Sequence, residues 1–203
     1  MSLTIVQIGT NTGIDHVRDF VKTLQDPRVL LVEPFSVHNK SIQSAYAPNK
    51  IRLENIAIVP DGRNDIALYY TELDGPNSFA AIANSHHRAI KTFQVASVVA
   101  GHVLKHYPNA TLKHINVPAH TLNSLFNMCG LVRIDYLFLD IEGIDFVCLK
   151  TIDFSAYDIR HLQIEHLHLD QNELHSFMSS KGYVASKGMD REGYDTMFTK
   201  ILS

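Results

Sequence analysis

The sequence has few of the features that mark secreted, membrane or nucleic-acid-binding proteins. Only two of its 203 residues are cysteines, Cys129 and Cys148, and neither has a metal-binding spacing, so we predict free buried thiols in a reducing compartment. No apolar run reaches the roughly 18 residues of a membrane span, and no basic leader precedes the first apolar stretch. The 18 basic residues, against 21 acidic ones, form no run that would attract nucleic acid or anionic membranes. We therefore expect a cytoplasmic protein that binds neither.

What the sequence does contain is typical of one globular domain. Hydrophobic residues make up 45% of the chain and charged residues 19%, and a chain of this size buries about 70% of the surface that its unfolded state exposes. No internal repeat or low-complexity tract divides it. We predict a single domain over residues 1–203.

The first third of the chain alternates between strand-like and helix-like patterns. The apolar run Leu3–Ile8 ends at Gly9, and apolar residues then recur at helical spacing as far as Asp26. A second apolar run, Val29–Val32, ends at Glu33 and Pro34, and a third strand is predicted at about 51–59. Buried strands separated by helices favour a mainly parallel sheet that is covered on both faces.

The pattern changes after Pro60, where we predict an insertion at about residues 60–120. Ile66, Leu68 and Tyr70 alternate as in a half-buried strand, and Leu112–Val117 is also expected to be extended. The stretch 95–104 has helical spacing together with a high β-branched content. The insertion also carries four basic or imidazole side chains: His86, His87, Arg88 and Lys91. We interpret them as a solvated surface cluster, and the alternative is contact with a polar or anionic acceptor if the segment folds over the crevice.

The last third resumes the alternation and ends in a predicted hairpin. Tyr136–Leu139 and Leu162–Leu169 are apolar enough for buried strands, and a helix from Gln171 is expected to end at Gly182. The segments at 183–186 and 196–202 then pair most simply as a hairpin, which places one strand antiparallel to the rest. The fold class is therefore α/β.

Two strand ends in the first half carry residues suited to a nucleoside. The turn Gly9-Thr10-Asn11-Thr12-Gly13 is a G-x-N-x-G loop, in which backbone can approach a ligand closely. Glu33 follows some 20 residues later, where an acid can accept hydrogen bonds from both ribose hydroxyls. Together they indicate an adenosine-type ligand, and the alternatives are a tight βα turn and a solvated strand end.

These stretches resemble the FkbM family of S-adenosylmethionine-dependent methyltransferases. The residues that carry the likeness are Val6–Gly13, Val32–Pro34, Asn55–Ile58, Val117–Leu125, Leu139–Gly143, Ile164-Glu165 and Lys181–Tyr183. The resemblance implies a Rossmann-like class I methyltransferase fold, with a seven-stranded, mostly parallel sheet and an antiparallel C-terminal hairpin strand. It also implies methyl transfer to a hydroxyl on a sugar or natural product. The insertion that we predict from the pattern would lie between strands three and four.

The resemblance also assigns cofactor-binding residues. The S-adenosylmethionine loop corresponds to Gly9, Asn11 and Gly13, and the ribose acid corresponds to Glu33. Gln7 stands where the family usually has an acid at the end of the first strand. The chain starts at that strand, so we expect no N-terminal segment that closes the substrate site. The insertion at 60–120 is a candidate cap on the substrate side.

Acidic and imidazole side chains after the later strands are the candidate catalytic groups. Asp140 directly follows the most apolar strand in the second half of the chain, where a carboxylate costs stability unless it binds something. Three roles stay open for it: base, partner of the donor's amino group, or ligand of a divalent ion. Glu142 is expected to accept hydrogen bonds at the start of the next helix. Glu165 and His166 are predicted at the mouth of the pocket.

No metal site is predicted near Glu165. On a strand, His166 and His168 share one face and Glu165 takes the other, so these residues form no tetrahedral set. We predict an S-adenosylmethionine-dependent O-methyltransferase that acts on a small-molecule or glycan acceptor. The alternatives are a nicotinamide-dependent oxidoreductase and a binding protein that kept the fold without the activity.

Overall fold

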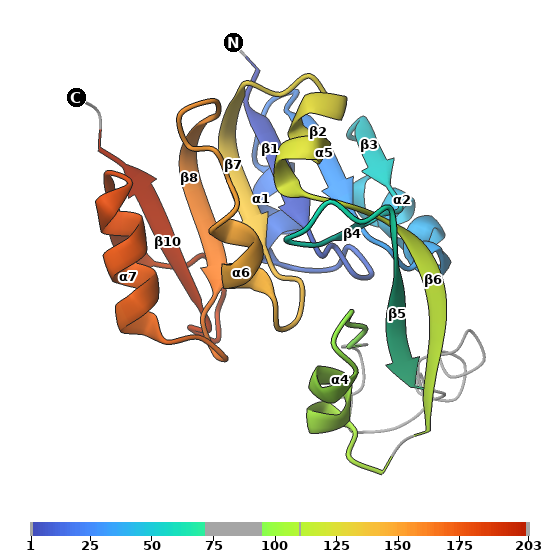
Figure 1. Cartoon of the computed structure of the whole chain (residues 1–203). Helices are drawn as coiled ribbons and strands as arrows, with labels where there is room; N and C mark the ends of the chain where they lie inside the picture. Colours follow the sequence, from blue (N-terminus) through green and yellow to red (C-terminus); the bar gives the residue numbers. More distant parts are fainter. Residues whose placement is uncertain (1, 72–94, 110, 202–203) are drawn as a thin grey trace.

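A seven-stranded sheet forms the centre of the computed structural model, which describes residues 2–71, 95–109 and 111–201 (Figure 1). The strands lie in the order β3-β2-β1-β7-β8-β10-β9, and β10 is antiparallel to both of its neighbours. This arrangement confirms the expected α/β fold with an antiparallel C-terminal hairpin. The strands are β1 (Thr4–Ile8), β2 (Arg28–Val32), β3 (Ile51–Glu54), β7 (Arg133–Leu139), β8 (Asp158–Glu165), β9 (Tyr183–Lys187) and β10 (Asp195–Lys200).

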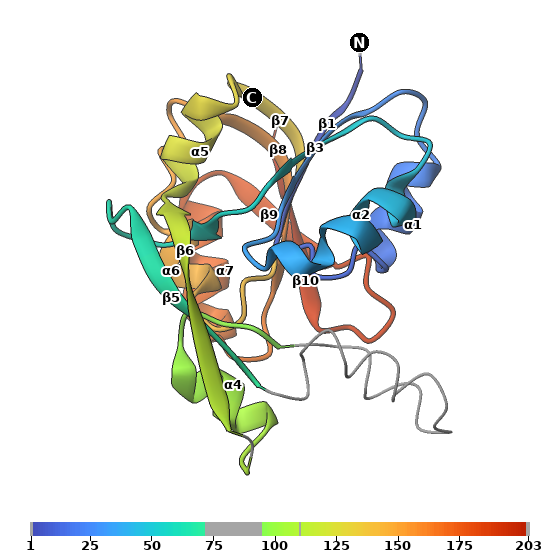
Figure 2. The ribbon, with the colours of Figure 1, turned by 90° about the vertical axis from the view of Figure 1, so that its right-hand side faces the viewer.

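Helices cover both faces of this sheet (Figure 2). One face is covered by α1 (His16–Lys22) and α2 (Asn39–Tyr46), with the short 3-10 helix η1 (Ser36–His38) before α2. The opposite face is covered by α5 (Leu122–Met128), α6 (Asp145–Leu149) and α7 (Gln171–Ser180). The two-sided cover explains why the central strands read as continuous apolar runs instead of alternating patterns.

Strand β1 shows this two-sided burial most clearly. Ile5 packs with the helices α1 and α2, while Val6 and Ile8 pack into the core under α5 and α6. All three side chains are at most 1% exposed. Since each fully buried aliphatic side chain stabilises the fold by about 1.5–3 kcal/mol, β1 is anchored from both sides.

A smaller sheet and a helix project beyond the edge at which the parallel strands end (Figure 1). The sheet has the order β4-β6-β5 and consists of β4 (Ala57–Ile58), β5 (Asp65–Thr71) and β6 (Leu112–His120). The helix is α4 (Ala100–His106), which begins later than the helical spacing from Val95 predicted. The expected strand around Ile66–Tyr70 is confirmed as β5, which pairs with β6.

The predicted third strand at 51–59 is wrong as a single element. It is divided at Asn55, whose side-chain amide donates to the Glu33 carbonyl and pairs with Asn39. The chain therefore leaves the central sheet after β3 and enters the smaller sheet as β4, which runs parallel to β6.

The predicted strand Leu162–Leu169 is displaced along the chain. The strand β8 ends at Glu165, and the chain then turns, with the Leu169 amide donating to the His166 carbonyl at 3.1 Å. His166 and His168 therefore do not share a strand face, and the argument against a metal site that used this face does not hold. The histidines and cations at 86–91 lie outside the described residues.

Two further observations bear on the predicted class of protein. Cys129 and Cys148 are both buried and form no disulfide, in agreement with the expectation. In the described ranges, no helix is long and apolar enough to cross a membrane.

Candidate functional site

The sheet order reverses direction between β1 and β7, and open α/β sheets bind ligands outside the carboxyl ends of strands at such a point. From β1 the chain builds outward through β2 and β3, and then returns to the other side of β1 with β7 and β8. The carboxyl ends of β1, β2 and β7 carry Gly9, Glu33 and Asp140, respectively. The topology thus brings three predicted site residues to one edge.

Gly9 joins these three strand ends. Its amide donates to the Val32 carbonyl at 2.9 Å, and its backbone has a φ of +83°. A Cβ at this position would lie 1.6 Å from the Asp140 carbonyl oxygen. The loop therefore requires glycine because its backbone meets the end of β7. Gly13, with a φ of +75°, packs less tightly, since a Cβ there would lie 3.1 Å from the Cα of Ile42 in α2. Packing thus gives a reason for glycine at both positions, besides the predicted close approach of a ligand.

Glu33 is held by the loop that follows β1. One carboxylate oxygen accepts a hydrogen bond from the Asn11 amide at 2.7 Å, and the other accepts from the Phe35 amide at 2.9 Å. The side chain is only 6% exposed. Burial raises the pKa of Glu33 to about 7, and the two backbone hydrogen bonds limit that rise. Asn11 and Glu33 are therefore in direct contact, and their binding of one nucleoside stays a prediction.

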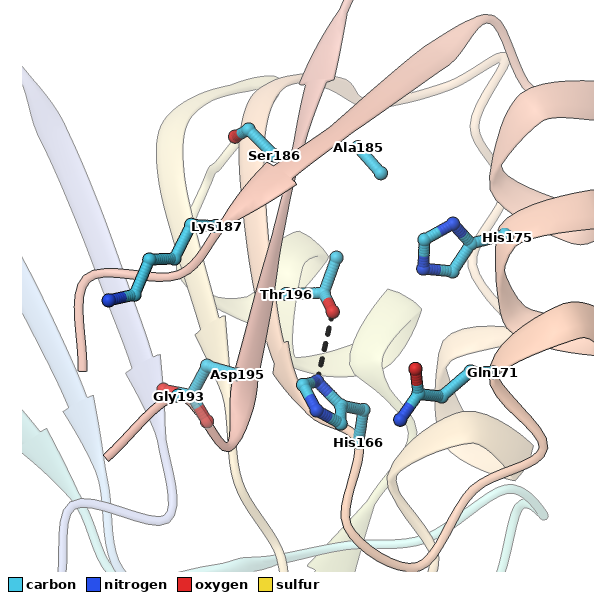
Figure 3. Close-up of a pocket in the computed structure, with 9 residues that line it drawn as sticks. All are labelled: His166, Gln171, His175, Ala185, Ser186, Lys187, Gly193, Asp195 and Thr196. Atoms are coloured by element: carbon cyan, nitrogen blue, oxygen red, sulfur yellow. Dashed lines mark hydrogen bonds between the residues drawn. The ribbon is translucent and has the colours of Figure 1, made fainter. Parts of the chain in front are cut away.

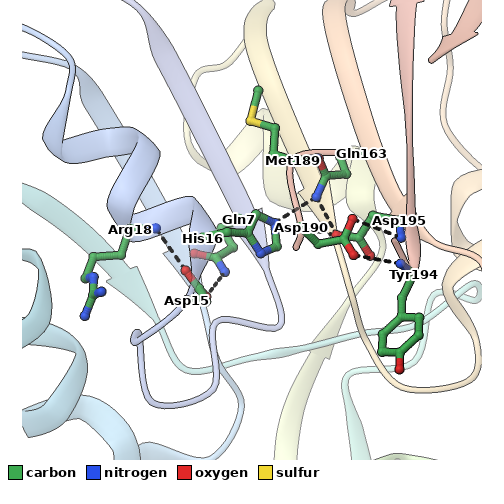
Figure 4. Close-up of polar contacts among 9 residues, drawn as sticks. All are labelled: Gln7, Asp15, His16, Arg18, Gln163, Met189, Asp190, Tyr194 and Asp195. Carbon is green, nitrogen blue, oxygen red and sulfur yellow. Dashed lines mark hydrogen bonds and ion pairs between the residues drawn. The ribbon is translucent and has the colours of Figure 1, made fainter. Parts of the chain in front are cut away.

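Gln7 is buried in a polar network instead of facing a ligand (Figure 4). Its carbonyl oxygen accepts from the Tyr46 hydroxyl, and its amide donates to the Asp15 carboxylate, both at 2.7 Å. Asp15 also caps α1 by accepting from the Arg18 amide at 2.9 Å. A carboxylate thus lies one hydrogen bond from the position at which the family usually places an acid.

A second part of this network connects α1 with the C-terminal hairpin (Figure 4). The Gln163 amide nitrogen lies 2.8 Å from His16 Nε2 and also donates to the Asp195 carboxylate. The Gln163 carbonyl accepts from the Met189 amide at 2.8 Å. Burial, together with the negative charge of Asp190, raises the pKa of Asp195 to about 6. These contacts fix the β8 and β10 ends beside the start of α1.

Three carboxylates gather where β7 and β8 end. Carboxylate oxygens of Asp140, Glu142 and Glu165 lie within 4.8 Å of one another. The pKa of Asp140 lies well above its usual range. Loss of hydration is the largest cause, and the negative charges of Glu142, Asp145 and Glu165 add to it. Part of the residue nevertheless stays exposed to solvent. The pKa of Glu165 rises to about 8 for the same two reasons. Asp140 and Glu165 are thus brought together as predicted.

The turn after β7 is held by Asp145, not by Glu142. The Asp145 carboxylate accepts from the Ile141 amide at 2.6 Å and from the Gly143 amide at 3.0 Å. Glu142 instead adopts a left-handed φ of +59°, and its carboxylate lies 2.8 Å from His102 Nε2. The expected role of Glu142 at the helix start is therefore wrong, because Asp145 already satisfies those backbone donors.

His166 faces a different recess. Its Nδ1 lies 2.9 Å from the Thr196 hydroxyl, and the recess has a volume of about 390 Å³ (Figure 3). The lining comes from the β8–α7 turn, α7 and the C-terminal hairpin, including Gln171, His175 and Asp195, and it contains none of the three clustered carboxylates. The catalytic role of His166 stays a prediction, and the structure does not add it to the carboxylate cluster.

His102 is the site residue that sequence reasoning missed. It comes from α4, is 4% exposed and contacts both Glu142 and the Gly143 backbone. Ser97, just before α4, donates to the Glu142 carbonyl at 2.7 Å. The only available signal was the spacing of His102 and His106 by four residues, which places two imidazoles on one face of a helix.

The arrangement can hold a nucleoside at Glu33 and a proton at the carboxylates. Three carboxylates at this spacing are also suitable ligands for a hard divalent ion, so the third role considered for Asp140 stays open.

Comparison with known proteins identifies a methyltransferase family. A family model described as Methyltransferase FkbM domain matches residues 7–185. The match includes the first loop, Glu33 and all three clustered carboxylates. No curated protein matches the chain.

Proposed function

This chain belongs to the FkbM methyltransferase family, and we propose that it transfers a methyl group from S-adenosylmethionine to a hydroxyl oxygen of a sugar or small natural product. The observation that carries the proposal is the meeting of the first loop, Glu33 and Asp140 at the switch point of the sheet. The family match favours this function over nicotinamide-dependent oxidation.

The residues at the end of β2 fit the nucleoside part of S-adenosylmethionine. Each carboxylate oxygen of Glu33 accepts one backbone hydrogen bond, and a carboxylate oxygen can accept two. One acceptor position per oxygen is therefore left for a ribose hydroxyl. The Asn11 amide bond fixes the carboxylate in this orientation, and the loop from Gly9 to Gly13 would lie along the same ligand. When bound, S-adenosylmethionine supplies an electrophilic methyl group.

The carboxylate cluster fits the proton transfer that methylation of a hydroxyl requires. Methyl transfer is an in-line displacement, so the protein aligns the two reactants and removes the acceptor's proton. A base works best when its pKa lies near the working pH, and the pKa of Glu165 is about 8. We infer that Asp140 and Glu165 together receive the proton, with Asp140 closer to the first loop because its carbonyl contacts Gly9.

The insertion at 60–120 is suited to cover the acceptor. Ser97 and His102 contact the turn that carries Glu142, and the smaller sheet extends past the carboxyl ends of the parallel strands. A cover on this side would exclude water and orient a hydroxyl toward the carboxylates. This role for the insertion is part of the proposal.

Calorimetry with S-adenosylhomocysteine tests cofactor binding. Saturable binding is expected for the natural chain, and Glu33→Gln is expected to weaken it at least about tenfold, because a charge-assisted hydrogen bond contributes about 1.5–3 kcal/mol. Glu173→Gln is the matched control, since Glu173 is exposed on α7 and pairs with Lys150. The absence of binding at millimolar ligand would contradict the proposal.

A transfer assay with S-adenosylmethionine labelled in its methyl group tests the reaction. Label is expected to appear in sugar or natural-product hydroxyls as base-stable methyl ethers. Binding without transfer to any hydroxyl or amine acceptor would indicate the non-catalytic binding protein. Stabilisation by NAD, but not by S-adenosylhomocysteine, would indicate the oxidoreductase.

A further inference from the structure

Three histidines from two distant parts of the chain meet beside Glu142. His102 and His106 lie one turn apart on α4, and His168 comes from the turn between β8 and α7. The ring centroid of His168 lies 4.8 Å from that of His102 and 6.0 Å from that of His106. One ring nitrogen of each residue lies within 4.8 Å of the other two.

This spacing is close to that of a tetrahedral metal site. Nitrogen ligands lie about 2.0–2.1 Å from zinc, so two ligands in a tetrahedron are about 3.4 Å apart. The three nitrogens now lie within 4.8 Å of one another, so the side chains would rotate to reach that separation on binding. His106 and His168 are exposed, so both have room to move, whereas His102 is buried and sets the position of the site.

Glu142 provides the partner that a metal-binding imidazole commonly has. Its carboxylate lies 2.8 Å from His102 Nε2. Histidines that bind a metal usually pair with a carboxylate or carbonyl, which fixes the ring and increases the basicity of its other nitrogen. The same carboxylate places a further oxygen ligand or partner beside the three rings.

Among the residues that the structure describes, few side chains anchor the helix that carries two of these histidines. α4 has seven residues, and His102 and Val103 are its only buried side chains. A helix this short is not stable by itself and depends on tertiary contacts. A metal that joins α4 to the turn after β8 would stabilise the helix, because the binding free energy at a structural metal site contributes to the folding free energy.

We propose that His102, His106 and His168 bind one zinc ion, which fastens α4 to the turn after β8 beside the carboxylate cluster. Three imidazoles are ligands typical of zinc and unlike the oxygen ligands of magnesium or calcium. The site is separate from the carboxylates of Asp140 and Glu165, and it does not depend on whether the chain transfers methyl groups.

Titration of zinc chloride into the full-length, chelator-treated chain tests the site. One equivalent is expected to bind. His106→Ala and His168→Ala are each expected to weaken binding by more than about 100-fold, and Glu142→Gln by about 10–100-fold as the loss of a supporting contact. Cobalt in place of zinc is expected to give the visible absorption bands of a tetrahedral ion. Zinc at 100 times its dissociation constant is expected to slow amide exchange in α4 by up to about 100-fold.

Matched controls separate this site from other histidines and from the carboxylates. His114→Ala changes an exposed histidine on β6, and Glu165→Gln changes the neighbouring cluster; both variants are expected to bind zinc as the natural chain does. The proposal is overturned if no zinc binds, if His114→Ala weakens binding as much as His168→Ala, or if only Glu165→Gln abolishes it. Circular dichroism in chelator establishes that the exposed His106 and His168 variants are folded.

Discussion

Glu33 and Glu165 each end a buried parallel strand at the same edge of the sheet, and burial raises the pKa of both, to about 7 and about 8. Their surroundings differ. Both oxygens of Glu33 accept backbone hydrogen bonds, whereas Glu165 faces the carboxylates of Asp140 and Glu142. The first glutamate stabilises the loop that it contacts, and the second adds repulsion to a crowded cluster.

Under the proposed function, this difference would divide the two tasks of the enzyme between the two glutamates. A nucleoside needs a fixed acceptor, and the Asn11 and Phe35 amides hold Glu33 in one position. Proton transfer needs a group that changes its charge near neutral pH, and burial, together with the neighbouring carboxylates, raises the pKa of Glu165 to about 8. The two regions meet where the Gly9 backbone contacts the Asp140 carbonyl.

Gly9→Ala is expected to break this contact and to have the largest effect. The new Cβ would overlap the Asp140 carbonyl oxygen, and the φ of +83° is unfavourable for alanine. The free energy of unfolding is expected to fall by about 4 kcal/mol or more in urea denaturation. Gly101→Ala is the control, since nothing lies within 4 Å of its Cβ position and alanine favours a helix, so a gain of up to about 1 kcal/mol is expected. Equal effects of the two substitutions would contradict the tight contact at Gly9.

Asp140→Asn is expected to lower kcat, and it tests the proposed role of the carboxylate cluster as proton acceptor. Loss of a positioned base typically lowers kcat about 100-fold or more, equivalent to about 2.7 kcal/mol. Calorimetry with S-adenosylhomocysteine is expected to change little, because Glu33 stays in place. Asp26→Asn, in an exposed loop at the opposite edge, is expected to leave kcat unchanged. Natural kcat in the Asp140 variant would exclude Asp140 as the base.

Glu33→Ala is expected to destabilise the fold as well as weaken cofactor binding. The variant removes the acceptor of two backbone amides, so the free energy of unfolding is expected to fall by about 2 kcal/mol. Glu54→Ala, at the end of β3, removes only a partly exposed ion pair with Arg52 and is expected to cost less than about 1 kcal/mol. Unchanged stability in the Glu33 variant would mean that these hydrogen bonds do not hold the loop.

Glu165→Gln is expected to raise the free energy of unfolding, and this effect is expected to be the smallest of the four. The carboxyl takes up a proton more readily when folded, with a pKa of about 8 against an ordinary value of 4.5. The folded state therefore loses stability as the pH rises from about 4.5 to 8. The variant lacks this loss and is expected to be about 1 kcal/mol more stable than the natural chain above pH 8, since water screens the partly exposed group. Urea denaturation at pH 5 and pH 9 measures the difference, and a difference that is the same at both values would exclude the repulsion.

Much of the fold could be predicted because it follows from local patterns. The sequence shows the apolar runs of β1, β2 and β7, because burial on two faces requires continuous apolar residues. It also shows the hairpin of β9 and β10. The break at Asn55 was not visible, because it depends on hydrogen bonds to Glu33 and Asn39. The ends of β8 also could not be placed, since the apolar pattern continues into the turn at Leu167 and Leu169.

The candidate site divides in the same way. The sequence by itself determined which chemical groups follow the strands: the glycine loop, Glu33, Asp140 and Glu165, each next to a run that must be buried. Only the tertiary structure decided that Glu142 turns toward His102 and that His168 meets α4. Glu142 and His102 are 40 positions apart in the sequence. Contact at that distance depends on how the insertion packs, and no local pattern encodes that packing.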